Sequence, residues 1–96
     1  MKISFSKENN VLNVTVDGRL DTSTAPEFEA FLKENCNGID GMIVNCEKLA
    51  YVSSAGLRVL LTAHKNLKDS LKLINVGELV MEVFEMTGFA TILNIQ

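Results

Sequence analysis

The order in which strand-like and helix-like segments follow one another is the strongest constraint on the fold of this chain. Residues 2–7 and 12–16 each alternate apolar and polar side chains, which is typical of half-buried strands. A polar turn at residues 8–10 separates them and predicts an antiparallel hairpin. Helix-like and strand-like segments then alternate to residue 95. We therefore expect an α/β fold with a mixed, mostly parallel sheet, because such alternation is typical of βαβ units.

The alternating part predicts three helices and three further strands. The first helix is expected from a Thr24-x-x-Glu27 capping box, with Pro26 in its first turn, to about Cys36. The apolar run at residues 42–44 predicts a buried central strand. The other elements are expected to be a helix at 54–68, a strand at 71–74, a helix at 78–87 that ends at Gly88, and a strand at 91–95. The order is β-β-α-β-α-β-α-β, and periodicity leaves open whether the helices cover one face of the sheet or both.

Length and charge restrict the function classes. The 96 residues, with a mass of 10.6 kDa, suit one domain that spans residues 1–96. Nine Lys and Arg against twelve Asp and Glu, with no basic run, argue against a nucleic-acid binder. The first ten residues do not resemble a secretory signal, and no apolar run approaches the roughly 20 residues that span a bilayer. We therefore expect a cytoplasmic protein without membrane insertion.

The residue types that usually carry catalysis or bind metal are scarce. Cys36 and Cys46 match no CxxC pattern, which favours two reduced, packed thiols, although the sequence leaves a disulfide open. His64 is the only histidine and is expected to be a partly buried structural residue at the edge of an apolar stripe. No GxGxxG or Walker A motif is present. We therefore predict no catalytic residue, no metal and no cofactor, and an enzyme or nucleotide binder is disfavoured.

The junction before the second helix has the most informative pattern. Ligands of parallel sheets meet the carboxyl ends of strands, and a helix start offers free N–H groups and a positive dipole end. At about 100° per residue, an apolar stripe forms one side of this helix, made of Gly56, Val59, Leu60, Ala63 and Leu67. Ser54, Arg58, Leu61 and Lys65 line the opposite side. Leu61 there is either a partner contact or an ordinary surface leucine.

Ser53 and Ser54 at this junction fit two interpretations. Either serine suits a simple N-cap. Alternatively, one hydroxyl is accessible to a kinase, and a phosphate would add about −1.5 to −2 charges that the helix dipole tolerates. Acidic groups on a bound partner would repel the phosphate, because two like unit charges about 4 Å apart raise the energy by about 4 kcal/mol at an effective dielectric of about 20. The pattern therefore allows a charge switch that needs no change of fold.

Several segments, taken in order, resemble a known family. They are Gly18-Arg19-Leu20-Asp21, Val44-Asn45-Cys46 followed by Leu49-Ala50-Tyr51-Val52, Ser53-Ser54-Ala55-Gly56-Leu57, and Thr87-Gly88-Phe89. Their order and spacing, over nearly the whole chain, are similar to those of the anti-sigma factor antagonists, the single-domain members of the STAS family. The resemblance implies a STAS fold, with residues 49–52 in the loop after the third strand.

The resemblance also implies a partner-switching function. In that family the unphosphorylated antagonist binds an anti-sigma factor that is also a serine kinase, and so releases a sigma factor. Phosphorylation breaks the complex, and a PP2C-type phosphatase reverses it. The alternative on the same fold is a non-switched scaffold or an accessory subunit of a transport or signalling assembly. The sequence gives no indication of the oligomeric state.

The resemblance assigns roles residue by residue. Alignment on Gly56-Leu57 places Ser54 at the family's phosphorylated serine, with Ser53 as the alternative acceptor in the position of the family's aspartate. Asp21 would lie on a loop beside the acceptor and help to form the kinase-docking surface, or else be a turn residue. The expected partner-binding residues are Asp21, Ser53, Ser54, Arg58, Leu61 and Lys65.

Overall fold

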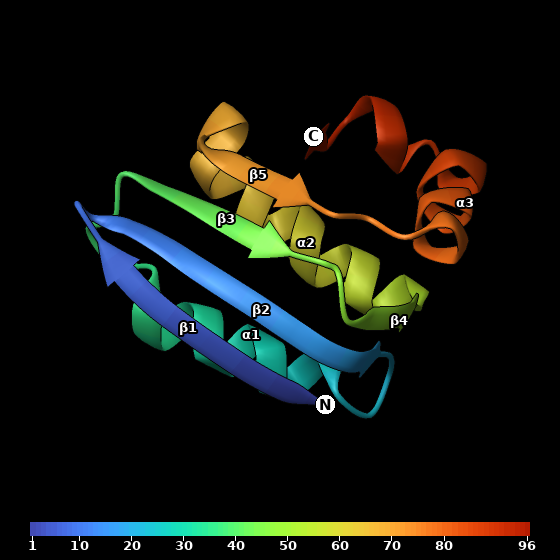
Figure 1. Ribbon diagram of the computed structural model, residues 1–96, viewed down its shortest axis with the longest axis horizontal. Helices are drawn as coiled ribbons and strands as arrows, with labels where there is room; N and C mark the ends of the chain where they lie inside the picture. Colours follow the sequence, from blue (N-terminus) through green and yellow to red (C-terminus); the bar gives the residue numbers. More distant parts are fainter.

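The computed structural model describes residues 1–96 and contains a six-stranded sheet with three α-helices (Figure 1). The strands are β1 (Lys2–Glu8), β2 (Val11–Leu20), β3 (Gly41–Asn45), β4 (Leu49–Val52), β5 (Leu71–Ile74) and β6 (Asn94–Ile95). The helices are α1 (Ala25–Asn35), α2 (Ser54–Leu67) and α3 (Glu78–Thr87), and two short 3₁₀ turns are η1 (Lys68–Ser70) and η2 (Phe89–Thr91). None of the helices combines the length and the apolar character needed to span a bilayer.

The sheet confirms the mixed, mostly parallel arrangement with an N-terminal antiparallel hairpin. β1 pairs antiparallel with β2, and every other pairing is parallel. The main path runs β1-β2-β3-β5-β6, so the apolar run of β3 is central, as predicted. The long strand β2 pairs with β3 through residues 11–15 and with β4 through residues 18–20, with an irregular register at Gly18. Gly18 has a φ of +114°, which favours glycine there.

The two longer helices cover one face of the sheet, which settles the question that periodicity left open. Figure 1 shows α1 and α2 behind the strands, and α3 beyond the carboxyl end of β5. The burial of β2 agrees, because Leu12, Val14 and Val16 are buried while Asn13 and Thr15 between them are only half-buried. No polar or charged side chain is buried. The core therefore lies between the sheet and the helices, and the polar face of the sheet remains open.

Strand β4 was not predicted, since residues 49–52 were expected in a loop. Its four residues are too few to display a clear period, and their burial pattern is buried at both ends and exposed in the middle. Its pairing partner is the far half of β2, about 30 residues earlier in the chain, with Gly18 opposite Leu49 and Leu20 opposite Val52. This strand is therefore the product of a tertiary contact rather than of local sequence preference.

The last strand is shorter than predicted. Residues 91–95 were expected to be extended, but the chain first forms η2, in which the N–H groups of Ile92 and Leu93 both donate to the Phe89 carbonyl, at 3.0 and 2.8 Å. Gly88 begins this turn with a φ of +81° and ends α3 where expected. Only Asn94 and Ile95 pair with β5. Hydrogen bonds within the turn after Gly88 thus replace most of the strand pairing that was expected for residues 91–95.

Both cysteines are free thiols, which resolves the disulfide that the sequence left open. Cys46 is buried at the end of β3, and desolvation raises the pKa of its thiol to about 12. Cys36, at the end of α1, is half-buried, and burial also raises the pKa of its thiol. Both side chains therefore act as small apolar groups that resist ionisation.

We predict that iodoacetamide labels Cys36 slowly in the folded protein and labels Cys46 only after denaturation, as intact mass would report.

The free energy of unfolding should also fall above about pH 8.5, where an unfolded thiol ionises and the folded Cys46 stays protonated. Stability falls with rising pH in this range because the folded state holds the Cys46 proton that the unfolded state has lost. The Cys46→Ala variant should lose much of this alkaline slope in urea unfolding. An unchanged slope in that variant would contradict the assignment to Cys46.

Candidate functional site

The start of α2 lies directly against the end of β2. The backbone N–H of Ser53 donates to the carbonyl of Leu20 over 2.9 Å. A Cβ atom at Gly56 would lie 2.7 Å from the Leu20 Cγ and 2.8 Å from the Leu20 carbonyl oxygen, so glycine is needed for this approach. The contact brings the loop after Leu20 and the first turn of α2 to the same end of the molecule, at the carboxyl ends of the parallel strands (Figure 1).

The structure gives the two adjacent serines different environments. Ser53 is the N-cap of α2, half-buried, and its Oγ accepts a 3.5 Å hydrogen bond from the Gly56 N–H. Ser54 is the first helical residue and is exposed. The first turn contains no acidic residue, and Arg58, one turn further on, is exposed. The capping interpretation is therefore confirmed for Ser53, and the accessible hydroxyl at the positive end of the helix dipole belongs to Ser54.

Asp21 organises the loop between β2 and α1. Its Oδ1 accepts hydrogen bonds from the Ser23 N–H at 3.0 Å, the Ser23 hydroxyl at 2.7 Å and the Thr24 N–H at 3.2 Å. These bonds, led by that of the Ser23 hydroxyl, hold the pKa of the Asp21 carboxyl below its usual value. The turn interpretation of Asp21 is thus confirmed, and its side chain is a fixed negative group at the same end of the fold as Ser54.

The predicted capping box is wrong, although α1 begins where expected. Thr24 is the N-cap, but its side chain makes no capping hydrogen bond. Its Oγ1 instead accepts from the Asp21 N–H at 2.9 Å and donates to the Arg19 carbonyl at 2.7 Å. The hydroxyl is therefore engaged with the loop that precedes the helix. A spacing rule does not reveal this competition, because it concerns only groups inside the helix.

Arg19 and Tyr51 are neighbours of the site that sequence reasoning missed. They are paired across β2 and β4, and the Arg19 guanidinium carbon lies 4.5 Å from the centre of the Tyr51 ring. The Arg19 Nε lies 3.5 Å from the Asp21 Oδ2. Because the pair is open to solvent, it contributes little to stability. The ion pair orients Arg19 beside the Asp21 loop, and the contact between Arg19 and Tyr51 depends on the unpredicted strand β4.

The exposed side of α2 is largely as predicted. Arg58 and Lys65 are exposed with Ser54, whereas Leu61 is half-buried. The buried side is wider than the predicted stripe, because Leu57 is only 5% exposed. It is wider since α2 packs against α1 as well as against β4 and β5. His64 is half-buried as expected, and its Nδ1 is shielded from solvent without a hydrogen-bond partner.

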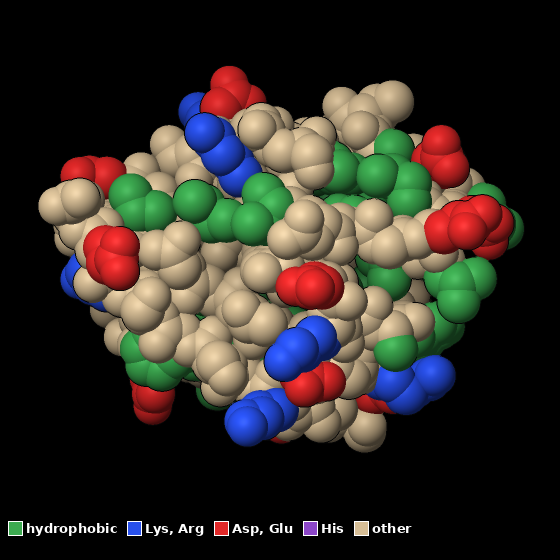
Figure 2. Space-filling model, in the orientation of Figure 1, with side chains coloured by type: hydrophobic (Ala, Val, Ile, Leu, Met, Phe, Trp, Pro, Cys, Tyr) green, Lys and Arg blue, Asp and Glu red, His purple; other side chains and the backbone are tan.

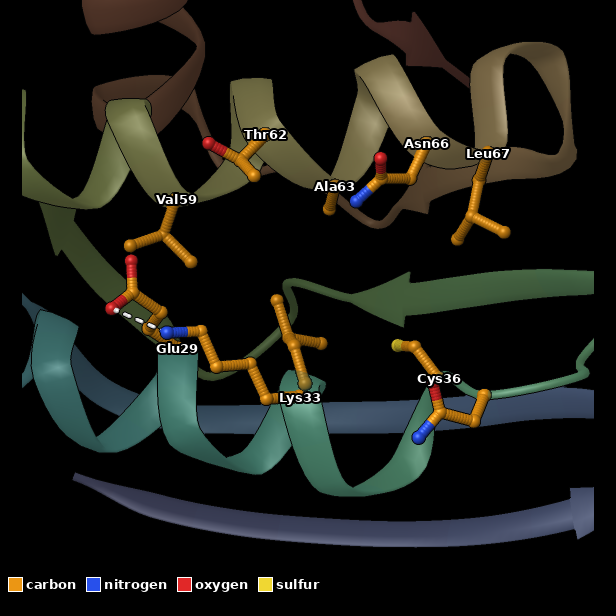
Figure 3. Close-up of a pocket in the computed structure, with 10 residues that line it drawn as sticks. Glu29, Lys33, Cys36, Val59, Thr62, Ala63, Asn66 and Leu67 are labelled. Atoms are coloured by element: carbon orange, nitrogen blue, oxygen red, sulfur yellow. Dashed lines mark ion pairs between the residues drawn. The ribbon is translucent and has the colours of Figure 1, made fainter.

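The larger cavity lies away from Ser54. It is a groove of about 390 Å³ between α1 and α2, bordered on the α1 side by the Glu29–Lys33 ion pair (Figure 3). Arg58 instead borders a smaller cleft of about 170 Å³ between the Asp21 loop and the first turns of both helices. Thr22 and Ala55 line opposite sides of this cleft. Of the predicted site residues, Arg58 alone lines one of these two cavities, and none lines the groove between α1 and α2.

Comparison with known proteins gives the family. The STAS domain model matches residues 2–96. BtrV of Bordetella bronchiseptica, named as an anti-sigma factor antagonist, is 33% identical over 96% of this chain and 83% of its own length. The anti-sigma-B factor antagonist of Staphylococcus aureus is 27% identical over 99% of this chain and 92% of its own.

Solved structures agree at the level of the fold. The anti-sigma factor antagonist SpoIIAA, in its unphosphorylated form, superimposes with a TM-score of 0.81 at 18% identity, over 99% of this chain and 88% of the other. The phosphorylated form of the Bacillus SpoIIAA superimposes with a TM-score of 0.73 at 17% identity, over 99% and 91%. With the family match over nearly the whole chain, these findings mean that this chain belongs to the STAS domain family, within its anti-sigma factor antagonists.

Proposed function

We propose that this chain binds an anti-sigma factor with serine kinase activity, and that phosphorylation of Ser54 breaks the complex. The observation that carries the proposal is the exposed Ser54 hydroxyl at the start of α2, beside a residue that already caps the helix. The names of BtrV and the Staphylococcus aureus relative support the partner class, and the unphosphorylated and phosphorylated forms of SpoIIAA support phosphorylation as the switch. A PP2C-type phosphatase would restore the binding state.

The local electrostatics suit a phosphate without a change of fold. A phosphoryl group on Ser54 would lie at the positive end of the α2 dipole, in a first turn that has no carboxylate. Arg58 follows at the i+4 position and is exposed, which allows it to face the phosphate. The helix therefore tolerates the added charge, and the cost falls on the bound partner. A loss of about 1.4 kcal/mol is already tenfold in affinity.

The proposed docking surface joins two elements. Asp21, Ser53, Ser54 and Arg58 lie at or near the end of the molecule where β2 meets α2. Leu61 and Lys65 extend this surface along α2, and Lys65 lies roughly 16 Å along the helix from Ser54. Leu61 is half-buried, so it offers only part of its side chain to a partner. Arg19 belongs to the same surface because it contacts both Asp21 and Tyr51. The surface is rich in charge, which suits a reversible interface whose affinity responds to a phosphate.

The first experiment is to incubate the purified protein with ATP and native-host lysate under phosphatase inhibitors, and to map any phosphate by mass spectrometry. We expect one phosphoryl group on Ser54, absent from Ser54→Ala and present in Ser53→Ala. Phosphate on Ser53 alone would contradict the assigned acceptor. No phosphate, while a control substrate is modified in the same lysate, would favour the non-switched scaffold.

The Ser54→Asp variant should weaken binding to the isolated kinase at least tenfold, while Ser54→Ala should bind as the wild type does. The reason is charge repulsion by the added carboxylate, because alanine removes the hydroxyl without adding charge. Titration calorimetry without ATP measures both affinities. Ser70→Asp, at an exposed serine in η1 at the far end of α2, is the matched charge control. Equal affinities of Ser54→Asp and Ser54→Ala would refute the switch at this residue.

A further inference from the structure

The exposed side of α3 combines an apolar row with an acidic row. Leu79 and Met86 are 70% and 86% exposed, and Val83 between them is half-buried. Leu79 and Met86 are seven residues apart and therefore lie within about 20° of each other around the helix. Glu78 and Glu82, with Glu85, follow the same spacing along one flank of this row. Figure 2 shows apolar and acidic side chains gathered together over the region of α3.

The charge of this helix is uncompensated. α3 contains three glutamates and no basic residue, whereas the nine other acidic residues of the chain equal its nine basic ones in number. None of the three glutamates forms an ion pair, because the two pairs in the structure involve residues of β2, its following loop and α1. Glu78 and Glu82 are like charges at i and i+4, and Glu85 lies in the negative half of the helix dipole. Cations placed along this flank would relieve both effects.

Three exposed large apolar side chains also gather at this end of the chain. Ile92, just after η2, is 46% exposed and is the third such side chain in this part of the chain, after Leu79 and Met86. The chain has only two other large apolar side chains with such exposure, Phe5 and Tyr51. Phe5 packs edge-on against Phe31, and Tyr51 lies under Arg19, so each has a partner within the fold. Exposed apolar side chains that share a helix face, unlike scattered ones, mark an interaction surface.

We propose that Leu79, Val83 and Met86, with the flanking glutamates, bind a basic amphipathic helix of a protein partner. The apolar row would pack against the partner's apolar row, and the three carboxylates would face its Lys or Arg residues. A second copy of this chain is disfavoured because it would bring two acidic rows together. An anionic membrane is disfavoured by the same charge. This surface is distinct from the residues around Ser54, so the proposal does not rest on the phosphorylation switch.

The test uses a 14-residue peptide of leucine and lysine with leucine at helical spacing, and a second peptide of equal composition without that spacing. Each is titrated into the ¹⁵N-labelled protein and followed by NMR. We expect amide shifts concentrated on α3 and η2, and at least tenfold weaker binding of the second peptide. The Leu79→Ser/Met86→Ser variant should also bind the first peptide at least tenfold more weakly, and Phe5→Ser should bind it as the wild type does.

Other results would overturn the proposal. Equal affinity for the two peptides would show attraction by charge alone, and shifts confined to other elements would place the contact elsewhere. Self-association of the wild type that Leu79→Ser/Met86→Ser abolishes in sedimentation equilibrium would make a second copy the occupant. If the wild type floated with phosphatidylglycerol vesicles and the same variant did not, the surface would bind an anionic membrane instead of a protein helix. Circular dichroism checks that the variant is folded, and Glu82→Gln/Glu85→Gln, which leaves the apolar row intact, should weaken the salt dependence of peptide binding.

Discussion

Truncating Phe84 to alanine is expected to lower the free energy of unfolding by about 3–5 kcal/mol. Phe84 lies on the buried side of α3, is 0% exposed and is among the largest fully buried side chains. Its removal would leave a cavity where α3 meets the core, and neighbouring side chains would fill it only in part. Since small domains are stable by about 5–15 kcal/mol, the variant would be near the limit of folding. Urea unfolding followed by circular dichroism measures the loss.

Met86→Ala on the same helix is the matched control. Met86 is 86% exposed, so its truncation should change the free energy of unfolding by no more than about 0.5 kcal/mol. Both changes insert alanine into one helix, and the difference in helix propensity is small in either case. A loss for Phe84→Ala that is no larger than the loss for Met86→Ala would show that α3 does not pack on the core as described.

Replacing Gly56 with valine is expected to lower the free energy of unfolding by about 1–3 kcal/mol. The new Cβ would meet the Leu20 carbonyl oxygen at 2.8 Å, and a backbone atom has no rotamer through which to move away. Valine is preferred to alanine because alanine has a helix propensity about 1 kcal/mol better than glycine, which would offset part of the overlap. The shift of α2 should also raise the hydrogen-exchange rate of the Ser53 amide, which donates to Leu20.

Gly77→Val is the control for a glycine with free space around it. Gly77 precedes α3, has no atom within 4 Å of an added Cβ, and has an extended backbone with φ of −73°. Its replacement should change the stability by less than about 1 kcal/mol and leave the Ser53 amide unaffected. Equal effects at the two glycines would mean that the approach of α2 to β2 is not what requires glycine at position 56.

Much of the fold was predictable because it rests on local patterns. The alternation in residues 12–16 predicted strand β2, which pairs with β1 on one side and with β3 on the other. The glycine at position 88 predicted the end of α3. The exposed and buried sides of α2 followed from the 3.6-residue period, apart from Leu57, which is buried, and Leu61 and Leu67, which are half-buried. These features depend on the geometry of a single element, so a single segment carries the necessary information.

Other features needed contacts between segments that are distant in the sequence. Strand β4 exists because residues 49–52 pair with the far half of β2, and this pairing also places Tyr51 under Arg19. The Thr24 hydroxyl matched a capping rule, yet it bonds to the loop before the helix because that loop folds back over it. The hydrophobic periodicity of a single segment predicts neither the pairing of β4 nor the hydrogen bonds of Thr24.

Four features follow from the amino-acid sequence alone: the order of the elements apart from β4, the antiparallel hairpin, the family resemblance and the serine pair at the start of α2. The assignment of Ser53 as the cap and Ser54 as the exposed serine came from the three-dimensional structure, in which the Ser53 N–H donates to the Leu20 carbonyl and its Oγ accepts from the Gly56 N–H. The structure also left the apolar and acidic rows of α3 without a partner inside the fold. Periodicity places a side chain on a face of its own helix, whereas its exposure depends on which other elements pack against that face.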